Sequence, residues 1–281
     1  MVKIVSDTST LYSPKEALNK GLYVNSLHIS LNNESYSEYV DIDSDQLLNK
    51  IKEGAIPKSS QPSIGQKIEL YDKLAIDDDL IDITIADGLS GTYQSALTAK
   101  ESSINKKRIT VFNSRTLCLP HRYLVDEALE MAKEGKDKDS ILAMLEKSSA
   151  TELSFLVPED FSFLYRGGRI PKTVAGIGEF LKLHICTKKN EQGNALEKFS
   201  VNRTFKKTLL SIMEYIIKKG IDDTYLFGIS HANNIDAANK TKEMLLSKFP
   251  KAQIEIMPLS CAFITQGGPG CCALQMIKII H

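Results

Sequence analysis

The chain has 281 residues, and its 35 lysine and arginine residues balance 35 aspartate and glutamate residues. Because no net positive charge draws the whole molecule to a polyanion, the composition argues against a nucleic-acid-binding protein. A hydrophobic content of 42% allows a substantial core, and the length corresponds to about two ordinary domains.

The lack of recognisable targeting signals and the cysteine usage predict a cytoplasmic protein. No uninterrupted apolar run reaches the roughly 18 residues that a membrane-spanning helix needs, and residues 1–7 lack the charged and apolar regions of a signal peptide. The five cysteines are an odd number without CxxC or zinc-ligand spacing, so we expect reduced, mostly buried thiols. We therefore expect a cytoplasmic protein without a metal or other cofactor.

Apolar stretches alternate with helical patterns in the first half, which is typical of a mainly parallel sheet covered by helices. The predicted strands are residues 2–6, 27–31, 80–86 and 109–112, and the predicted helices are residues 45–53, 91–102 and 122–133. A second unit is predicted to begin at about residue 155, where lysine-rich helical sequence gives way to a strand and then to an irregular segment.

The second half predicts further strands and helices. A helix with Thr204 as its N-cap is predicted because six apolar residues fall on one helical face. They are Phe205, Leu209, Ile212, Met213, Ile216 and Ile217. Strands at 225–230 and 254–259 flank a helix at 235–246. We therefore predict an α/β protein of two domains, with a mainly parallel sheet covered by helices in residues 1–155 and an α/β domain in residues 156–281.

The first candidate for a binding function is the serine-rich segment 57–66, which we predict to be a proline-stiffened loop just before a helix. Ser63 and Gln66 have the spacing of a capping box, which is a sufficient structural reason for Ser63. Ser59 and Ser60 are not explained in this way. Their hydroxyls could bind an anion near the helix start, where the backbone N–H groups and the helix dipole already favour negative charge.

The second candidate is the segment 87–96, which follows a predicted strand and enters a helix. Ligands of open α/β sheets bind at such loops. Gly88 and Gly91 allow close approach of backbone, and Ser90 either caps the helix or donates to a ligand oxygen. Because Gly91 directly follows Ser90, the segment is not the G-x-S-x-G elbow of a serine hydrolase.

Two glycine-rich segments complete the candidates. Arg166 and Arg169 flank a glycine pair within residues 163–172, a pattern suited to phosphate or carboxylate, and a solvated turn explains it equally well. Residues 265–272 contain three glycines in four positions, which let backbone approach a ligand or another strand. A simple turn is the alternative for this segment as well.

The remaining polar residues give weaker indications. The P-loop, dinucleotide-binding and zinc-protease motifs are missing from the sequence. The histidines lie singly, and a lone histidine is more often a structural residue than a base. Asp7 ends the first predicted strand and is either an acid at the sheet edge or a turn and capping residue.

Five segments together resemble the DegV family in their order and spacing. They are Ser6-Asp7-Thr8-Ser9, Ser59-Ser60-Gln61-Pro62-Ser63, Gly88-Leu89-Ser90-Gly91-Thr92-Tyr93-Gln94-Ser95-Ala96, Arg166-Gly167-Gly168-Arg169-Ile170 and Gly268-Pro269-Gly270. Each motif alone is weak, but the five in order make the resemblance strong and extend it from end to end of the chain.

The resemblance implies a two-domain α/β protein that encloses a long-chain fatty acid between its domains. It also implies the acyl-carrying subunit of bacterial fatty acid kinase, which acts in phospholipid metabolism. A separate ATP-dependent kinase subunit would phosphorylate the bound acid, so we expect a carrier and not a self-sufficient enzyme, with transient membrane-surface contact allowed for. The residues so implied are Ser59, Ser60, Ser90, Gly91, Gln266 and Gly267 for the ligand and Arg166 and Arg169 for the kinase subunit.

Three departures from the family pattern concern the head group. Ser59 stands where the family usually has threonine, which keeps the hydroxyl donor. Gln266 stands where the family commonly has a histidine, one residue before the final Gly-Pro-Gly with Gly267 between them. The glutamine amide can donate a hydrogen bond but cannot become cationic. Ala86 and Asp87 replace a serine pair, and an anion there would repel a carboxylate unless it were protonated or pointed away.

Two other classes of function stay open at this point. A hydrolase or acyltransferase would use Ser90 as its nucleophile, with His231 or another histidine as its base. A structural or regulatory protein would use the candidate loops only to cap helices and the arginines to bind a partner.

Overall fold

The computed structural model describes residues 1–170, 183–190, 192–193 and 195–280. It divides into two compact units: unit 1 comprises Met1–Ala150 and Ser260–Ala262, and unit 2 comprises Thr151–Leu259 and Phe263–His281. Both combine helices with a sheet, so the predicted α/β class is confirmed. Pro171 and Lys172, which close the arginine- and glycine-rich segment, and His281 lie outside the described residues.

A four-stranded parallel sheet forms the centre of unit 1. Its strand order is β2 (Tyr23–Asn25), β1 (Val2–Asp7), β6 (Asp79–Thr84) and β7 (Ile109–Asn113). The chain runs from β1 outward to β2 and from β6 outward to β7, so the order reverses between β1 and β6. Ligands of open α/β sheets bind at the carboxyl ends of the strands beside such a reversal.

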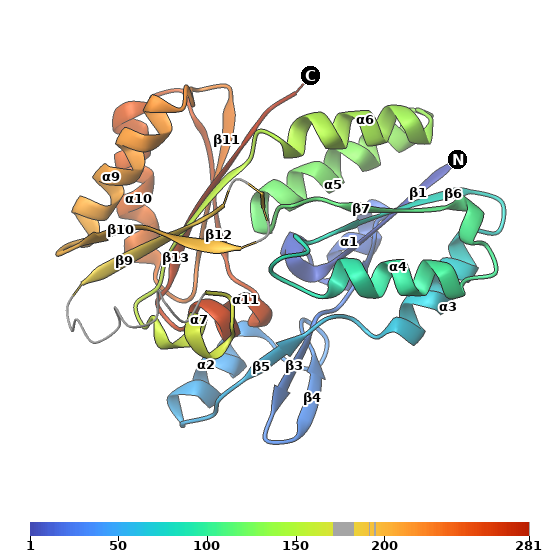
Figure 1. Ribbon diagram of the computed structural model, residues 1–281, viewed down its shortest axis with the longest axis horizontal. Helices are drawn as coiled ribbons and strands as arrows, with labels where there is room; N and C mark the ends of the chain where they lie inside the picture. Colours follow the sequence, from blue (N-terminus) through green and yellow to red (C-terminus); the bar gives the residue numbers. More distant parts are fainter. Residues whose placement is uncertain (171–182, 191, 194, 281) are drawn as a thin grey trace. The chain divides into compact units, whose positions relative to one another are not determined.

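Helices cover both faces of this sheet (Figure 1). The helices α3 (Ile64–Leu74) and α4 (Thr92–Ser102) lie on one face, while α5 (Cys118–Lys133) and α6 (Lys138–Ser149) cover the other. On the first face, α3 and α4 enclose a buried apolar cluster with the sheet, which includes Val5, Tyr71, Leu74, Leu80, Ala99 and Ile109. The helix predicted at 122–133 begins four residues earlier, because Pro120 lies in its first turn, where proline is tolerated.

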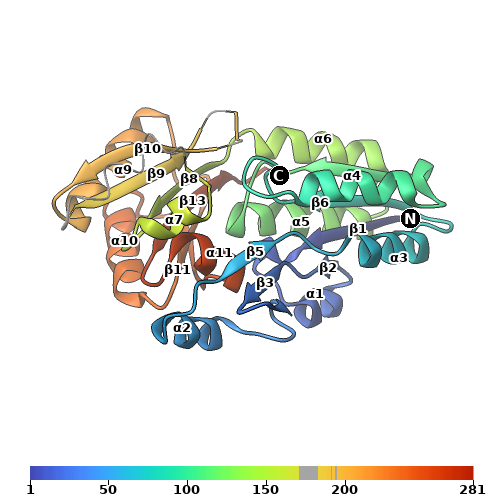
Figure 2. The same cartoon turned by 60° about the horizontal axis from the view of Figure 1, so that its bottom comes forward.

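A small antiparallel sheet also belongs to unit 1, with the order β4 (Glu34–Ser37), β3 (His28–Leu31) and β5 (Lys58–Ser60). Figures 1 and 2 both show β3 and β5 side by side. The strand predicted at 27–31 is confirmed as β3. The prediction that Ser59 and Ser60 lie in a loop was wrong, because backbone pairing with β3 makes this stretch a short strand.

The remaining elements of unit 1 are short. A 3₁₀-helix η1 (Thr8–Thr10) follows β1, and η2 (Lys106–Arg108) precedes β7. The helix α1 (Pro14–Lys20) leads into β2, and α2 (Ser44–Lys52) connects the small sheet's hairpin to β5.

Unit 2 contains a six-stranded mixed sheet. Its order is β10 (Leu196–Asn202), β9 (His184–Lys189), β8 (Leu153–Val157), β13 (Cys272–Lys278), β11 (Tyr225–His231) and β12 (Gln253–Pro258). Only the pair of β11 and β12 is parallel among these described strands.

Three helices in the described part of unit 2 pack on its sheet. The helices α9 (Phe205–Lys218) and α10 (Ile235–Lys248) share one buried core with it. As predicted, Thr204 is the N-cap of α9, and its side chain accepts a hydrogen bond from the Lys207 N–H. The helix α7 (Ser162–Arg166) contributes Leu164 to a smaller cluster against β9. Within the described ranges, no helix combines the length and hydrophobicity needed to cross a membrane.

Candidate functional site

Hydroxyl side chains follow the ends of three neighbouring strands of the parallel sheet in unit 1. They are Thr8, Ser9 and Thr10 after β1, Ser90 and Thr92 after β6, and Ser114 and Thr116 after β7. Parallel strands end at the same edge of a sheet, and here that edge includes the reversal between β1 and β6. The hydroxyls therefore stand at the position where this class of sheet binds ligands.

Asp7 joins the ends of the two central strands. One oxygen of its fully buried carboxylate accepts the Ser9 N–H at 2.9 Å, and the other accepts the Ile85 N–H at 3.0 Å. Asp7 is also the N-cap of η1. Of the two interpretations of this residue, the structure supports capping, because both oxygens already bind backbone.

Ser9 is held by His121, which reaches it from α5. The Ser9 Oγ lies 2.7 Å from Nδ1 of His121, and Nε2 lies 3.0 Å from the Ile83 carbonyl oxygen. Complete burial lowers the pKa of His121, so we assign a neutral ring that donates from Nε2 and accepts the Ser9 hydroxyl at Nδ1. His121 is thus a structural residue, and its sequence neighbourhood gives no sign of a partner 112 positions away.

The two serine-bearing segments meet in unit 1. Ser59 is the half-buried central residue of β5 and pairs with Ile29. Two residues later, the Gln61 side chain lies against Gly91, where an added Cβ would be only 3.2 Å from Gln61 Oε1. Segments 59–63 and 88–92, which the sequence singled out separately, therefore adjoin.

Ser90 lies at the entrance to α4 and is half-buried. Its Oγ lies 2.8 Å from the Thr92 hydroxyl and accepts the Thr92 N–H at 3.3 Å. The N-cap itself is Gly91, which has no side chain for capping. When Thr92 donates, the Ser90 O–H is directed elsewhere and can serve an anion at the positive end of the helix dipole.

Three further polar residues of these segments, Ser63, Ser60 and Asp87, make no contact in the described chain that supports a capping box or a buried charge. Ser63 is the N-cap of α3, but its side chain makes no capping hydrogen bond, so the predicted capping box was wrong. Its ψ of 128° falls short of the 154° at Ser13, whose side chain does cap a helix. Ser60 is exposed opposite His28. Asp87 is exposed as well, so its charge is solvated.

A buried glutamate in unit 1 was missed by sequence reasoning. Glu38 accepts the Thr8 hydroxyl with one oxygen and the Ala262 N–H at 2.8 Å with the other. It is fully buried, and burial raises its pKa to about 7. Glu38 therefore connects the end of β1 to the short stretch 260–262. An isolated charged residue beside a turn gives no sequence signal for this role.

In unit 2, the two glycine-rich segments pack against each other. Gln266 lies in α11 (Cys261–Gly267), and a Cβ added at Gly167 would be 1.8 Å from its Oε1. A Cβ at Gly268 would be 2.7 Å from the Phe163 ring, and one at Gly267 would be 2.7 Å from the sulfur of Cys271. Both segments therefore need glycine for close packing within unit 2.

The two arginines of unit 2 differ in their surroundings. Arg166 is exposed, donates to the Ser162 hydroxyl at 2.9 Å, and has its guanidinium 4.5 Å from the centre of the Phe163 ring. Arg169 is half-buried and donates to the Gly167 carbonyl. The guanidinium of Arg166 is thus held by Ser162 and Phe163 and faces solvent. Arg169, in contrast, stabilises the backbone of the glycine pair.

The remaining candidate for acid–base chemistry is His231 of unit 2. Its Nδ1 accepts the Asn234 N–H at 3.1 Å, and burial lowers its pKa. This bond gives His231 a local structural role at the end of β11. Within the described part of the chain, no group of three or more His, Cys, Asp or Glu side chains could hold a metal ion.

Comparison with known proteins identifies relatives along the whole chain. The family model described as an uncharacterised protein of the DegV family matches residues 1–278. A DegV domain-containing protein of Halalkalibacterium halodurans is 30% identical, with 98% of this chain and 97% of the relative covered. A second one, from Caldanaerobacter subterraneus, is also 30% identical, with 96% of each chain covered.

Solved structures with the same fold include fatty-acid-binding proteins. One from Streptococcus agalactiae matches with a TM-score of 0.88 and 26% identity, covering 100% of this chain and 99% of the other. DegV of Bacillus subtilis, a fatty acid binding protein, matches with a TM-score of 0.84 and 27% identity, covering 99% of each chain.

Proposed function

This chain belongs to the DegV family, and from that membership we propose that it binds a long-chain fatty acid. The carboxylate would lie at the carboxyl edge of the parallel sheet in unit 1, with Ser59 and Ser90 as its hydroxyl donors. The observation that carries this proposal is the contact of Gln61 with Gly91, because it brings the segments of both serines together.

The chemistry of these segments suits a carboxylate. An ionised carboxylate only accepts hydrogen bonds, and serine hydroxyls and helix-start N–H groups donate them. The first turn of α4 adds its dipole beside Gly91. Burial of the acyl chain would supply most of the affinity, at about 0.8 kcal/mol per CH₂ group. Ser60 is proposed as a further contact, and so are Gln266 and Gly267 of unit 2.

We also propose that the bound acid is presented to a separate ATP-dependent kinase subunit, which would form the acyl phosphate. Arg166 supports this proposal as an exposed cation, and Arg169 lies three residues later in the same segment. The chain would then be a cytoplasmic carrier in phospholipid metabolism, and catalysis would belong to its partner.

Analysis of lipid bound to the purified protein tests the fatty-acid proposal. Native mass spectrometry should show an added mass, and extraction should release a long-chain acid in about equal amount to the protein. Protein that is recovered empty and takes up neither palmitate nor oleate would contradict the proposal. Ester hydrolysis that Ser90→Ala abolishes would favour the hydrolase alternative.

A further inference from the structure

A buried ionic cluster joins α3 to β6 in unit 1. Lys67 and Asp82 are both fully buried, and Nζ lies 2.5 Å from Oδ2. Tyr71, one turn after Lys67, donates its hydroxyl to the same oxygen. Burial raises the pKa of Tyr71, which keeps the phenol a neutral donor. The other oxygen, Oδ1 of Asp82, is buried without a hydrogen-bond partner in the described chain.

Stability alone does not account for this cluster. A buried ion pair loses the hydration of both charges, and apolar residues of similar volume are often as stable or more stable in its place. Its neighbours are apolar, since Tyr71 packs with Leu74 and Leu80 in the cluster between helix and sheet. Apolar contacts tolerate small shifts, but a hydrogen-bonded ion pair requires its donor and acceptor to face each other. The pair of Lys67 and Asp82 therefore forms at only one position of α3 along β6.

The two joined elements carry the two segments of the proposed head-group site. The helix α3 starts at Ile64, directly after segment 59–63, and β6 ends at Thr84, shortly before segment 88–92. A slip of α3 by one turn, about 5.4 Å, would separate Lys67 from Asp82. The same slip would carry segment 59–63 away from segment 88–92.

We propose that Lys67, Tyr71 and Asp82 are positioning residues that hold the Ser59 and Ser90 segments in register for the fatty-acid carboxylate. This inference rests on the proposed function. The three side chains do not contact the ligand. They act by fixing where α3 lies along β6, and hence how far apart the two serines stand.

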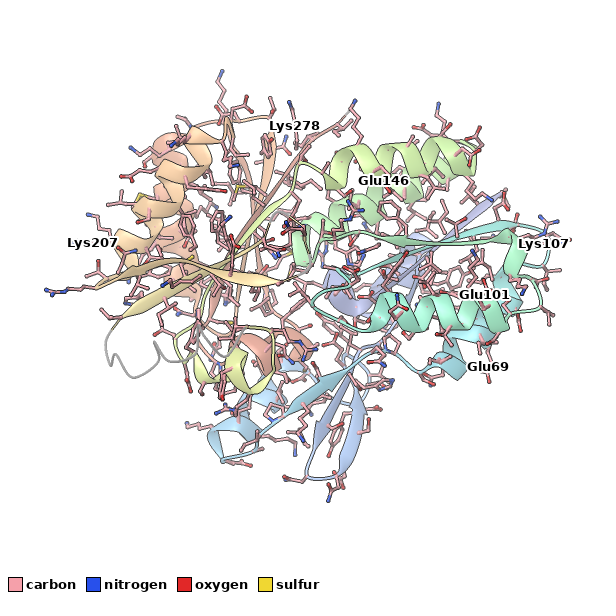
Figure 3. All side chains as sticks on the ribbon, in the orientation of Figure 1. Glu69, Glu101, Lys107, Glu146, Lys207 and Lys278 are labelled. Atoms are coloured by element: carbon pink, nitrogen blue, oxygen red, sulfur yellow. The ribbon has the colours of Figure 1, made fainter. Side chains whose placement is uncertain are left out.

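The same helix offers a matched control. Glu69 is exposed on α3, two residues after Lys67, and Figure 3 shows its side chain pointing outward. Glu69→Gln removes a charge from α3 without touching the cluster. Lys67→Met together with Asp82→Leu removes both buried charges and keeps the volume filled. Tyr71→Phe deletes one donor only and serves as the second test variant should the double variant fail to fold.

The experiment compares these variants with the wild type in two measurements. Hydrogen exchange of residues 58–63 and 86–92 is followed in protein stripped of lipid, and palmitate affinity is then measured on the same samples. Urea unfolding reports whether each variant is folded. We expect the double variant to remain folded, with a lower unfolding midpoint because the buried Tyr71 hydroxyl loses its acceptor, while exchange in both segments rises about fivefold and palmitate binds about tenfold more weakly.

Each outcome decides the role of the cluster. Exchange at wild-type rates, or palmitate affinity within about twofold of wild type, would show a merely structural cluster and overturn the inference. An equal effect of Glu69→Gln would overturn it too, because the effect would then follow from any change of charge on α3 and not from loss of the buried cluster. A wild-type protein that binds no palmitate contradicts the proposed function instead, and exchange in the lipid-free proteins then decides the positioning role alone.

Discussion

The side chain of Gln61 occupies the space that a side chain at residue 91 would need, since a Cβ at Gly91 would lie 3.2 Å from Gln61 Oε1. The two residues are 30 positions apart and belong to the segments of Ser59 and Ser90. A small change at Gly91 therefore acts on the proposed head-group site without removing a hydroxyl.

Gly91→Ala should weaken fatty-acid binding while leaving the fold intact. The added methyl group displaces the exposed Gln61 amide by a few tenths of an ångström, and the backbone at Gly91 has a φ of −71°, which alanine adopts freely. We expect an affinity loss of about 1 kcal/mol, or about fivefold. Titration with palmitate measures it.

Gly65→Ala is the matched control, because a Cβ there would make only an ordinary contact, 3.8 Å from Ser63 Oγ. It should stabilise α3 by about 0.5–1 kcal/mol and leave palmitate affinity unchanged. Equal affinities for Gly91→Ala and wild type would show that the contact with Gln61 does not shape the site.

The raised pKa of Glu38 predicts that the free energy of unfolding decreases as the pH rises. Burial raises its pKa from 4.5 to about 7 in the folded protein, so the unfolded chain ionises first. The folding contribution is complete below pH 4.5 and is lost as the pH rises through 7, by about 3 kcal/mol in total. Urea unfolding of wild type and Glu38→Gln from pH 4 to pH 8 should show this loss in the wild type alone.

The difference in the free energy of unfolding between wild type and Glu38→Gln isolates the contribution of Glu38 from that of other titrating groups. His121 acts in the opposite direction, because its lowered pKa makes the folded state less stable as the pH falls below 6.5. Glu53→Gln, at an exposed position, should follow the wild type. Parallel curves for wild type and Glu38→Gln would mean that Glu38 does not carry a raised pKa.

Gly167→Ala should displace the Gln266 side chain in unit 2. The new Cβ would lie 1.8 Å from Gln266 Oε1 and 3.2 Å from the Phe163 carbonyl oxygen. We expect the free energy of unfolding to fall by about 1–3 kcal/mol. Adding Gln266→Ala should restore most of it, and additive effects in this double-mutant cycle would contradict the contact.

Arg166→Ala should leave palmitate binding unchanged and lower phosphorylation of the bound acid by the kinase subunit about tenfold, the effect of losing one charge-assisted contact. Arg169→Ala should do the same and also cost about 1 kcal/mol of stability, since Arg169 donates to Gly167. Lys207→Ala, on α9 in Figure 3, is the control for surface charge. Unchanged phosphorylation in a reconstituted assay would refute the assignment of the arginines.

Much of the architecture could be predicted because it depends on patterns of neighbouring residues in the sequence. The apolar alternation of β1 and β6 and the helical face behind Thr204 depend on residues close in sequence. Two of the five motifs, residues 59–63 and 88–96, also adjoin in unit 1. By contrast, β5 is a three-residue strand of Lys58, Ser59 and Ser60, which lacks apolar alternation and exists through its pairing with β3.

The parts that escaped prediction depend on partners far apart in the chain. Lys67 looks like a surface residue until Asp82 is known to face it, and the apolar neighbours of Asp82 give no hint of a buried charge. Glu38 likewise meets Ala262 across 224 positions. No spacing rule covers such contacts, because the fold and not the local sequence brings them together.

The preference for palmitate over hexadecanol tests the central claim most directly, measured in wild type and in Ser59→Ala combined with Ser90→Ala. Each hydrogen bond to a charged group contributes about 1.5–3 kcal/mol, so the double variant should bind palmitate at least about 100-fold more weakly and hexadecanol almost equally well. Ser63→Ala, whose hydroxyl makes no capping bond, is the control. A double variant that keeps the wild-type preference for the acid would contradict the claim that these serines hold the carboxylate.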